Sequence, residues 1–275
     1  MVKLDAYFAR IGYDGPRTPT LATLRALHAL HPAAIPFENL TPLLGQRVSL
    51  ELADIEAKLV DAQRGGYCFE HGKLFRSVLD ALGFRTTPLA ARVVWGPPAA
   101  ALPPRCHMLL LVEAEGERWV TDVGFGGVTL TTPLRLEADI VQRTPHEPFR
   151  LQTLDGGDWL LQVLLGEAWH DVYRFDLTPQ LDADYGLSNY YVNTHPESLF
   201  VNHLLAARAT AGVRHTLFNG ELNRYDPQPS QRRINSVEDL RDVLREIFGI
   251  RLPDADGSVT SAALDAALAR CLAAA

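Results

Sequence analysis

The chain has 275 residues, 47% of them hydrophobic and 21% charged, and a formal net charge of -7 at pH 7. This length allows two domains, or one enzyme built of two or three sub-domains around a shared cleft. The composition is that of a globular protein and excludes a disordered or fibrous one. The negative charge argues against nucleic acid or an anionic membrane surface as the main partner.

The cysteines and the first residues indicate the compartment. Cys68, Cys106 and Cys271 are odd in number and widely scattered, so they do not make a disulfide framework and they favour a reducing compartment. The N-terminus lacks the apolar core of a signal peptide, and no apolar run reaches membrane-spanning length. We therefore expect a cytoplasmic protein with no membrane partner.

The first part of the chain carries helical patterns. Apolar residues recur with helical spacing, and Pro32 is expected to stop the second helix because its ring breaks a helix interior. Helices are predicted over residues 4–11, from about 20 to 31, over about 50–62, and from 68 to about 82. These patterns predict a helical bundle over residues 1–84.

From Thr86 the period changes to that of strands. Short β-like runs are separated by turns rich in Gly, Asp and Glu, a spacing typical of an antiparallel barrel or sandwich. The runs cover residues 90–95, 108–112, 119–123, 149–154, 160–165 and 172–175. We therefore predict a β unit over residues 85–190.

The last region mixes both patterns. A helix is expected over 182–194, two β-like runs lie around Gly212 and around Asn219-Gly220, and Ser236 caps a helix that ends at Gly249. An alanine-rich helix over 260–275 closes the chain. The predicted third unit is residues 191–275.

A glycine-rich turn, Arg64-Gly65-Gly66-Tyr67-Cys68, leads directly into the helix that begins at Cys68. The unpaired N–H groups and the dipole at a helix N-terminus favour the thiolate, which is the nucleophilic form of cysteine. The two glycines allow a tight turn and a close approach to the sulfur. The pattern therefore predicts a reactive thiol at Cys68.

A predicted hairpin brings His107 and Asp122 together. If the loop is centred between Ala114 and Glu115, the two residues face each other across the strands. If the loop is Glu115-Gly116, they are diagonal neighbours on the same face. Either register pairs an imidazole with a carboxylate, and together with Cys68 these groups supply a nucleophile, its base and the group that orients the base.

Plainer interpretations of the same residues stay open. Cys68 could be a buried small apolar residue, and His107 with Asp122 could be a purely structural pair. Cys68 and His71 with Cys106 and His107 could bind zinc, although adjacent residues on one strand point to opposite faces. Cys271, in the terminal helix, is most simply structural.

Two further features surround the predicted thiol site. The loop Val123-Gly124-Phe125-Gly126-Gly127 could turn backbone N–H groups toward an anion such as a pyrophosphate, or simply end a strand. Aromatic side chains that could line a pocket are Phe37, Tyr67, Phe125 and Phe200.

These motifs together resemble the signatures of the arylamine N-acetyltransferase family, and the resemblance extends over nearly the whole chain. The matching segments are Tyr7 to Gly12, Ile35 to Leu40, Arg64 to Glu70, His107 in its apolar strand, Asp122 to Gly126, and Ser198 to Val201. Cys106, beside the histidine, departs from the family, where threonine is common. That departure puts in doubt any coenzyme contact at this position.

The resemblance implies an α+β fold with an N-terminal helical bundle, a central antiparallel β-barrel and a C-terminal α/β lid, around a cysteine-protease-like core. It implies a Cys-His-Asp triad of Cys68, His107 and Asp122, with acetyl-CoA as co-substrate and no metal. It also implies that Phe37, Phe125 and Phe200 contact the acceptor or the thioester, and that Trp95 and Gly126, with Gly127 beside it, lie near coenzyme A.

The predicted reaction is a ping-pong transfer of acetyl from acetyl-CoA, through an acetyl-cysteine, to an arylamine, an arylhydrazine or a similar acceptor. The alternative is a papain-like or transglutaminase-like cysteine hydrolase, which would use the same three groups on an amide. The expected oligomeric state is a monomer or a homodimer.

Overall fold

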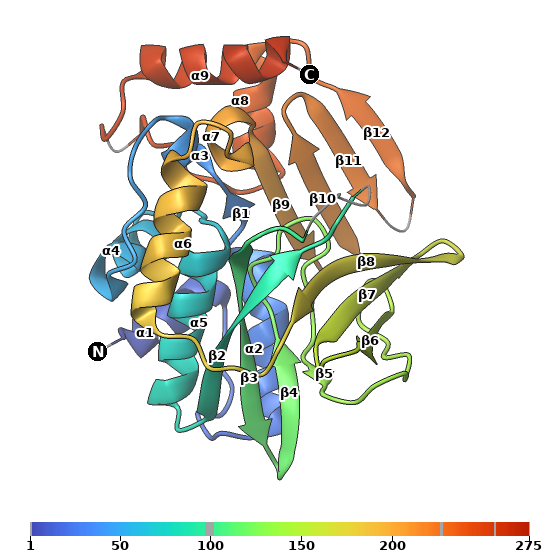
Figure 1. Cartoon of the computed structure of the whole chain (residues 1–275). Helices are drawn as coiled ribbons and strands as arrows, with labels where there is room; N and C mark the ends of the chain where they lie inside the picture. The colour runs from blue at the N-terminus through green and yellow to red at the C-terminus, as the bar shows by residue number, and fades with distance from the viewer. Residues whose placement is uncertain (1, 97–101, 226–227, 256, 275) are drawn as a thin grey trace.

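The computed structural model describes residues 2–96, 102–225, 228–255 and 257–274. Helices from the N-terminal part lie against one side of a curled sheet, and a second sheet with two helices covers the end of the molecule (Figure 1). The N-terminal helical elements are α1 (Leu4–Ile11), α2 (Leu21–Ala34), α3 (Leu40–Leu43), α4 (Leu52–Glu56), the π-helical η1 (Ala57–Asp61) and α5 (Cys68–Ala81). The predicted bundle, barrel and lid are therefore confirmed as the architecture.

The second helix differs from the prediction because it continues through Pro32 to Ala34. Pro32 lies in the last turn, which is closed by a bond from Ile35 N to His31 O of 2.8 Å. His31, whose helical conformation the proline disfavours, is fully buried and hydrogen-bonded to Tyr7 and His71. Tertiary packing therefore overrides the local signal.

The third predicted helix is divided between α4 and η1. The chain passes from α-helical to π-helical bonding at Ala57, and Ala62 N bonds to Ala57 O at 2.8 Å. The wider turn keeps Leu59 and Val60 buried while it accommodates one extra residue per turn. Hydrophobic spacing alone does not distinguish the two kinds of helix.

The central sheet has the strand order β5-β4-β3-β2-β8-β7-β6, and neighbouring strands are antiparallel. Isolated bridges from Ala138 to Leu151 and from Gln142 to Phe149 attach the segment after β5 to β6, so the sheet curls into a barrel around its own apolar core. Its strands are β2 (Arg85–Val93), β3 (Arg105–Ala114), β4 (Glu117–Thr121), β5 (Leu134–Arg135), β6 (Phe149–Thr153), β7 (Trp159–Leu165) and β8 (Ala168–Phe175).

The end of the molecule is closed by a second sheet of strand order β1-β9-β10-β11-β12. Its first strand comes from the N-terminal part of the chain, since Phe37 pairs with Ala207 (Figure 1). The elements are β1 (Phe37–Glu38), α6 (Asp182–Thr194), α7 (Leu199–Asn202), β9 (Leu205–Thr210), β10 (Val213–Phe218), β11 (Glu221–Tyr225), β12 (Ser230–Arg233), α8 (Val237–Glu246) and α9 (Ser261–Ala273).

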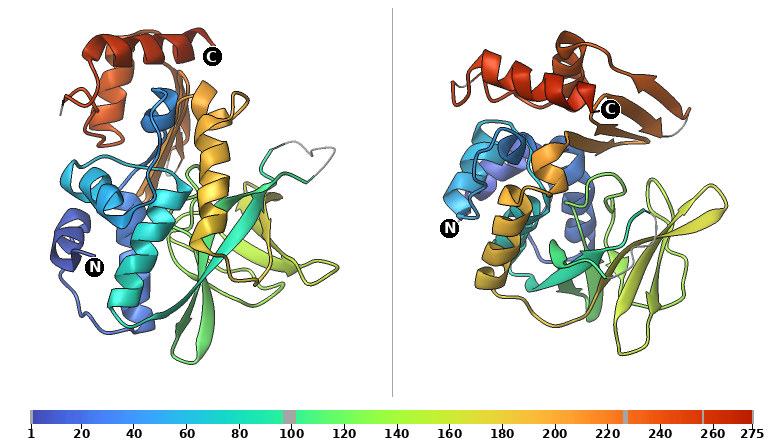
Figure 2. Two further views of the ribbon diagram at one scale, coloured as in Figure 1. Left: turned by 60° about the vertical axis from the view of Figure 1, so that its left-hand side comes forward. Right: turned by 45° about the horizontal axis from the view of Figure 1, so that its top comes forward.

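The two further views in Figure 2 show α8 and α9 on the side of this second sheet that faces away from the barrel. Their apolar side chains form a core with those of β9 to β11. The division at residues 84 and 190 stays a prediction, and position 190 falls inside α6. Among the described helices, none combines the length and apolar character needed to cross a membrane.

Candidate active site

The turn before Cys68 is held against residues 36–38. Gly66 N bonds to Pro36 O at 3.3 Å, and Glu38 N bonds to Gly66 O at 2.8 Å. A Cβ at Gly65 would lie 2.1 Å from Pro36 O, so only glycine allows this approach. The turn is thereby fixed before α5 begins.

A buried ion pair reinforces the same contact. Arg64 donates to Glu38 Oε1 at 2.9 Å and also to the Thr41 hydroxyl at 3.2 Å. Burial alone would raise the pKa of Glu38, but the neighbouring Arg64 and Lys58 hold that pKa below its ordinary value. The pair therefore stays charged and fixes the position of the turn that carries Cys68.

His107 and Asp122 form a buried hydrogen bond of 2.7 Å between Nε2 and Oδ2. The other carboxylate oxygen accepts from Gly124 N at 3.0 Å, and Asp122 N donates to His28 Nε2 at 3.2 Å. Because a carboxylate only accepts, Nε2 of His107 carries the proton. The lone pair therefore lies on Nδ1, which can accept a proton.

The register of this hairpin is the second of the two predicted. The pairs Leu110–Thr121 and Ala114–Glu117 place the loop at Glu115-Gly116, both with positive φ (54° and 81°). A two-residue turn with positive φ at both positions matches the twist of the strands. The directly facing register is thus wrong, and the imidazole and carboxylate are diagonal neighbours.

Cys68 is the first residue of α5, and its residue surface is only 4% exposed. Its sulfur donates to Cys106 O at 3.6 Å, which places it beside the residue that precedes His107. Burial raises the pKa of the Cys68 thiol, while backbone hydrogen bonds from Met108 and Phe69 act in the opposite direction. A base that accepts the thiol proton offsets this effect of burial.

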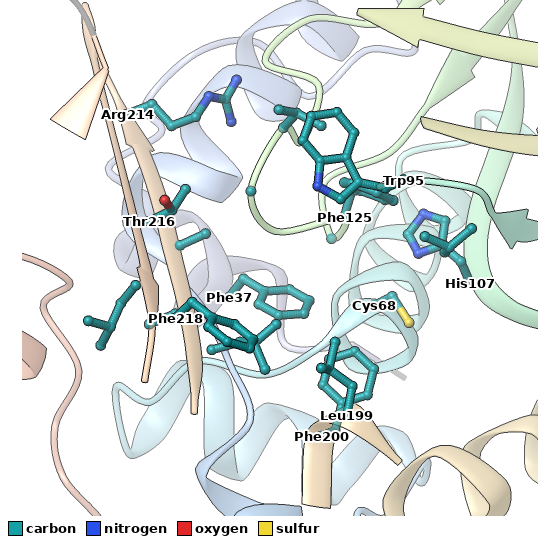
Figure 3. A pocket seen from close by; sticks show the side chains of 18 of the residues that line it. Phe37, Cys68, Trp95, His107, Phe125, Leu199, Phe200, Arg214, Thr216 and Phe218 are labelled. Atoms are coloured by element: carbon teal, nitrogen blue, oxygen red, sulfur yellow. The ribbon is translucent and has the colours of Figure 1, made fainter. Parts of the chain in front are cut away.

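A cavity of about 300 Å³ opens onto the sulfur and the imidazole. Figure 3 shows Cys68 and His107 at one end, Arg214 at the other, and aromatic rings between them. The predicted pocket residues Phe37, Phe125 and Phe200 line its wall, as do Trp95 and Gly127. Such an apolar cleft with a few convergent polar groups is typical of a small-molecule site.

Tyr67 and Gly126 do not line this cavity. Tyr67 is fully buried, its hydroxyl donates to Asn189, and its ring meets that of Phe200 edge-on at 5.5 Å. It supports the pocket wall from behind, because a 14-residue helix begins immediately after it and turns its ring inward. Gly126, with φ of 94°, packs against the far side of Phe37.

Several pocket residues were not predicted from the sequence. They are Glu147, Leu199, Arg214, Thr216, Phe218 and Tyr225 among others. The segments that carry them are distant in sequence from Cys68, and apart from Leu199, which lies in the matching segment Ser198 to Val201, they belong to no motif. Only the period-2 spacing of Arg214, Thr216 and Phe218 indicates that they share one face of a strand.

A chain of buried histidines behind Cys68 was also missed. Tyr7 donates to His31 Nδ1, and His31 Nε2 donates to His71 Nδ1, both at 2.8 Å. His71 Nε2 then donates to Pro36 O and Gly66 O at 3.2 and 3.1 Å. Both ring nitrogens of His71 are thereby engaged in hydrogen bonds, which argues against His71 as a zinc ligand. Among the described residues, no cluster of metal-binding side chains occurs.

Comparison with known proteins identifies the group to which this arrangement belongs. The sequence pattern of the N-acetyltransferase family matches residues 20–256. The arylamine N-acetyltransferase of Escherichia coli K12 is 45% identical over 260 residues, which are 94% of this chain and 92% of the relative. That of Mycobacterium tuberculosis H37Rv is 43% identical over 256 residues, which are 91% and 90% of the two chains.

Solved structures agree over the same length. The arylamine N-acetyltransferase of Mycobacterium smegmatis superposes with a TM-score of 0.92 at 41% identity, covering 98% of this chain and 99% of that one. The Mycobacterium marinum enzyme in complex with CoA gives 0.92 at 38% identity, covering 97% and 98%. The chain therefore belongs to the arylamine N-acetyltransferase family.

Proposed function

We propose that Cys68, His107 and Asp122 carry out the acetyl transfer of this family, from acetyl-CoA to an arylamine or arylhydrazine. The observation that carries the proposal is the 2.7 Å bond between His107 Nε2 and Asp122 Oδ2, in a cavity that also exposes the Cys68 sulfur. The carboxylate fixes one tautomer, and the free Nδ1 is the base.

In the first half-reaction the Cys68 thiol attacks the carbonyl carbon of the acetyl thioester as His107 Nδ1 takes the thiol proton. The carbon–sulfur bond to coenzyme A breaks, and His107 returns the proton to the departing thiolate. Backbone N–H groups in the first turn of α5 stabilise the transient oxyanion. The products are an acetyl-cysteine and free coenzyme A.

In the second half-reaction the amine nitrogen of the acceptor attacks the acetyl-cysteine. His107 takes a proton from that nitrogen and gives it to the Cys68 sulfur as the thioester breaks. Asp122 stabilises the imidazolium while it exists. The rings of Phe37, Phe125 and Phe200 exclude water from the thioester, so the amine is favoured over hydrolysis.

The cavity fits the two substrates at different places. Trp95, Phe218 and Tyr225 line it with exposed fractions of 44, 40 and 38%, so they mark its mouth. There the body of coenzyme A, which is too large for the cavity, extends toward solvent over aromatic surfaces.

We also propose a reducing compartment, because the three cysteines are unpaired and a disulfide at Cys68 would block the nucleophile.

The test is the mass of the intact protein after incubation with acetyl-CoA without acceptor. One added acetyl group is expected, and addition of aniline should remove it and yield acetanilide. Cys68→Ser is the matched variant, because a hydroxyl in this site lacks the acidity and nucleophilicity of the thiol and should remain unmodified. An unmodified wild-type protein that hydrolyses amides would instead establish the hydrolase alternative.

A further inference from the structure

The guanidinium of Arg214 forms part of the pocket wall far from Cys68. Arg214 lies in β10 and is 1% exposed. Its Nε and Nη2 donate to the carboxylate of Glu147 at 3.1 and 2.7 Å, and Nη2 also donates to Thr129 O at 3.1 Å. Nη1 is buried and has no partner. A buried donor without an acceptor is rare in folded proteins, and this one belongs to a side chain that lines the cavity.

A second polar group without a partner lies beside it. Thr216 is two residues further along β10, on the same face, and it also lines the cavity. Among the described residues its hydroxyl makes no hydrogen bond. Figure 3 shows the side chains of Arg214 and Thr216 directed from the same strand into the pocket. The wall therefore presents two adjacent donors, and the nearby Glu147 carboxylate is already paired with Arg214.

The charge of this wall restricts what it can bind. Arg214 is already neutralised by Glu147, so the pair as a whole carries no net charge. A carboxylate added at this point would leave one uncompensated negative charge in an apolar cavity, which is costly. A neutral oxygen, such as the carbonyl of an amide or a ketone, accepts from both donors without adding charge.

The depth of the wall indicates which substrate reaches it. On the face of β10 that carries Arg214, Thr216 and Phe218, exposure rises from 1% at Arg214 to 40% at Phe218, so Arg214 marks the closed end of the cavity and Phe218 its mouth. Coenzyme A has to extend through the mouth, whereas a flat aromatic amine fits between the mouth and the closed end. The far end of the acceptor is the part that meets Arg214 and Thr216.

We infer that Arg214 Nη1 and the Thr216 hydroxyl form a specificity subsite for arylamines that carry a neutral carbonyl group opposite the amine. The inference rests on the proposed function, because it places the amine of the same molecule at the acetyl-cysteine. It distinguishes two groups of acceptors: aryl carboxamides and ketones are favoured, and alkyl-substituted anilines of similar size are not.

The test compares 4-aminobenzamide with 4-ethylaniline as acceptors for the wild type and for Thr216→Val. The ratio of kcat/KM for the two amines should fall about 3- to 10-fold in the variant, the loss of one neutral hydrogen bond. Intrinsic differences in amine reactivity cancel, because the same pair is measured on both proteins. The matched control is Thr194→Val on α6, whose hydroxyl bonds within its own helix and which lies outside the cavity.

Two more measurements sharpen the test. Arg214→Lys keeps a cation beside Glu147 but removes the planar fork, and it should lower the same ratio by at least about tenfold. In the wild type, 4-aminobenzoate should have a lower kcat/KM than 4-aminobenzamide. Its carboxylate would add an uncompensated negative charge beside the Arg214–Glu147 ion pair.

A failure of the proposed subsite can be distinguished from a failure of the proposed function. Acetylation of Cys68 by acetyl-CoA is measured by intact mass for each variant before the acceptors are added. If Cys68 is acetylated and the ratios in Thr216→Val and Arg214→Lys equal that of the wild type, the subsite is refuted and the transferase stands. A raised KM for acetyl-CoA with an unchanged acceptor ratio also refutes the subsite, because it assigns the two donors to the coenzyme.

Discussion

A glycine packs directly against the helix that carries Cys68, and replacing it tests how far the site tolerates displacement. Gly124 follows the strand that leads to Asp122, and a Cβ built there would lie 2.8 Å from His71 Cβ and 3.1 Å from Cys68 Cα. Neither atom is the end of a flexible side chain. In Gly124→Ala the loop must therefore move away from α5 as a whole.

The size of the movement follows from van der Waals distances. Carbon atoms are in favourable contact at about 3.5–4.0 Å, so the loop has to shift by roughly 0.7–1.2 Å. Gly124 N bonds to Asp122 Oδ1, so the carboxylate and the imidazole it holds move with the loop. A displacement of about 1 Å in a catalytic group lowers the rate by about 100-fold, and overpacking costs about 1–3 kcal/mol of stability.

The assay is the single-turnover rate of Cys68 acetylation, with the free energy of unfolding measured in urea. Gly186→Ala is the matched control, because Gly186 lies in α6 and a Cβ there meets nothing within 4 Å. The control should acetylate like the wild type and be slightly more stable. If Gly124→Ala acetylates within threefold of the wild-type rate and unfolds at the same urea concentration, the reasoning from this contact is wrong.

Two other predictions concern charge. Asp122→Asn keeps the shape of the side chain but not its charge, so the imidazole adopts the wrong tautomer. The kcat for arylamine acetylation should fall by on the order of 10³-fold or more. A loss below tenfold would contradict the role given to the carboxylate. Burial lowers the pKa of His28 and of His71 from 6.5 to about 4, so only the unfolded chain takes up these protons between those values. The stability contributed by the neutral rings is complete above pH 6.5 and is lost as the pH falls toward 4. The urea concentration at the midpoint of unfolding should therefore be lower at about pH 5 than at about pH 7.5. Equal midpoints would show that the rings are not buried neutral.

The sequence predicts the elements whose signals are local. α6 matches the expected range, and α8 begins after the predicted cap, where Ser236 accepts from Asp239 N. The pairing of His107 with Asp122 was predictable because a hairpin brings near neighbours together. The choice between its two registers was not, because it depends on the left-handed conformation of Glu115.

Features that depend on distant contacts escape the sequence. Nothing in Phe37-Glu38 indicates a strand, because its pairing comes from β9, far along the chain, and from a single bridge to Gly66. His28 and His31 share the buried face of α2 with leucines, so an apolar stripe conceals them. Arg214 belongs to the pocket only because β10 packs over the barrel, and strand periodicity does not reveal what a face packs against.

The pairing of β1 with β9 also has a consequence for how the enzyme is made. Phe37 and Ala207 are 170 positions apart, and the same Phe37 bridges Gly66 in the turn before the nucleophile. During synthesis the ribosome must therefore release more than two thirds of the chain before this short strand finds its partner. Contacts of such large sequence separation form late and slowly. The nascent helical region holds Cys68 without its finished surroundings, so acetylating activity should begin only when the C-terminal sheet has folded.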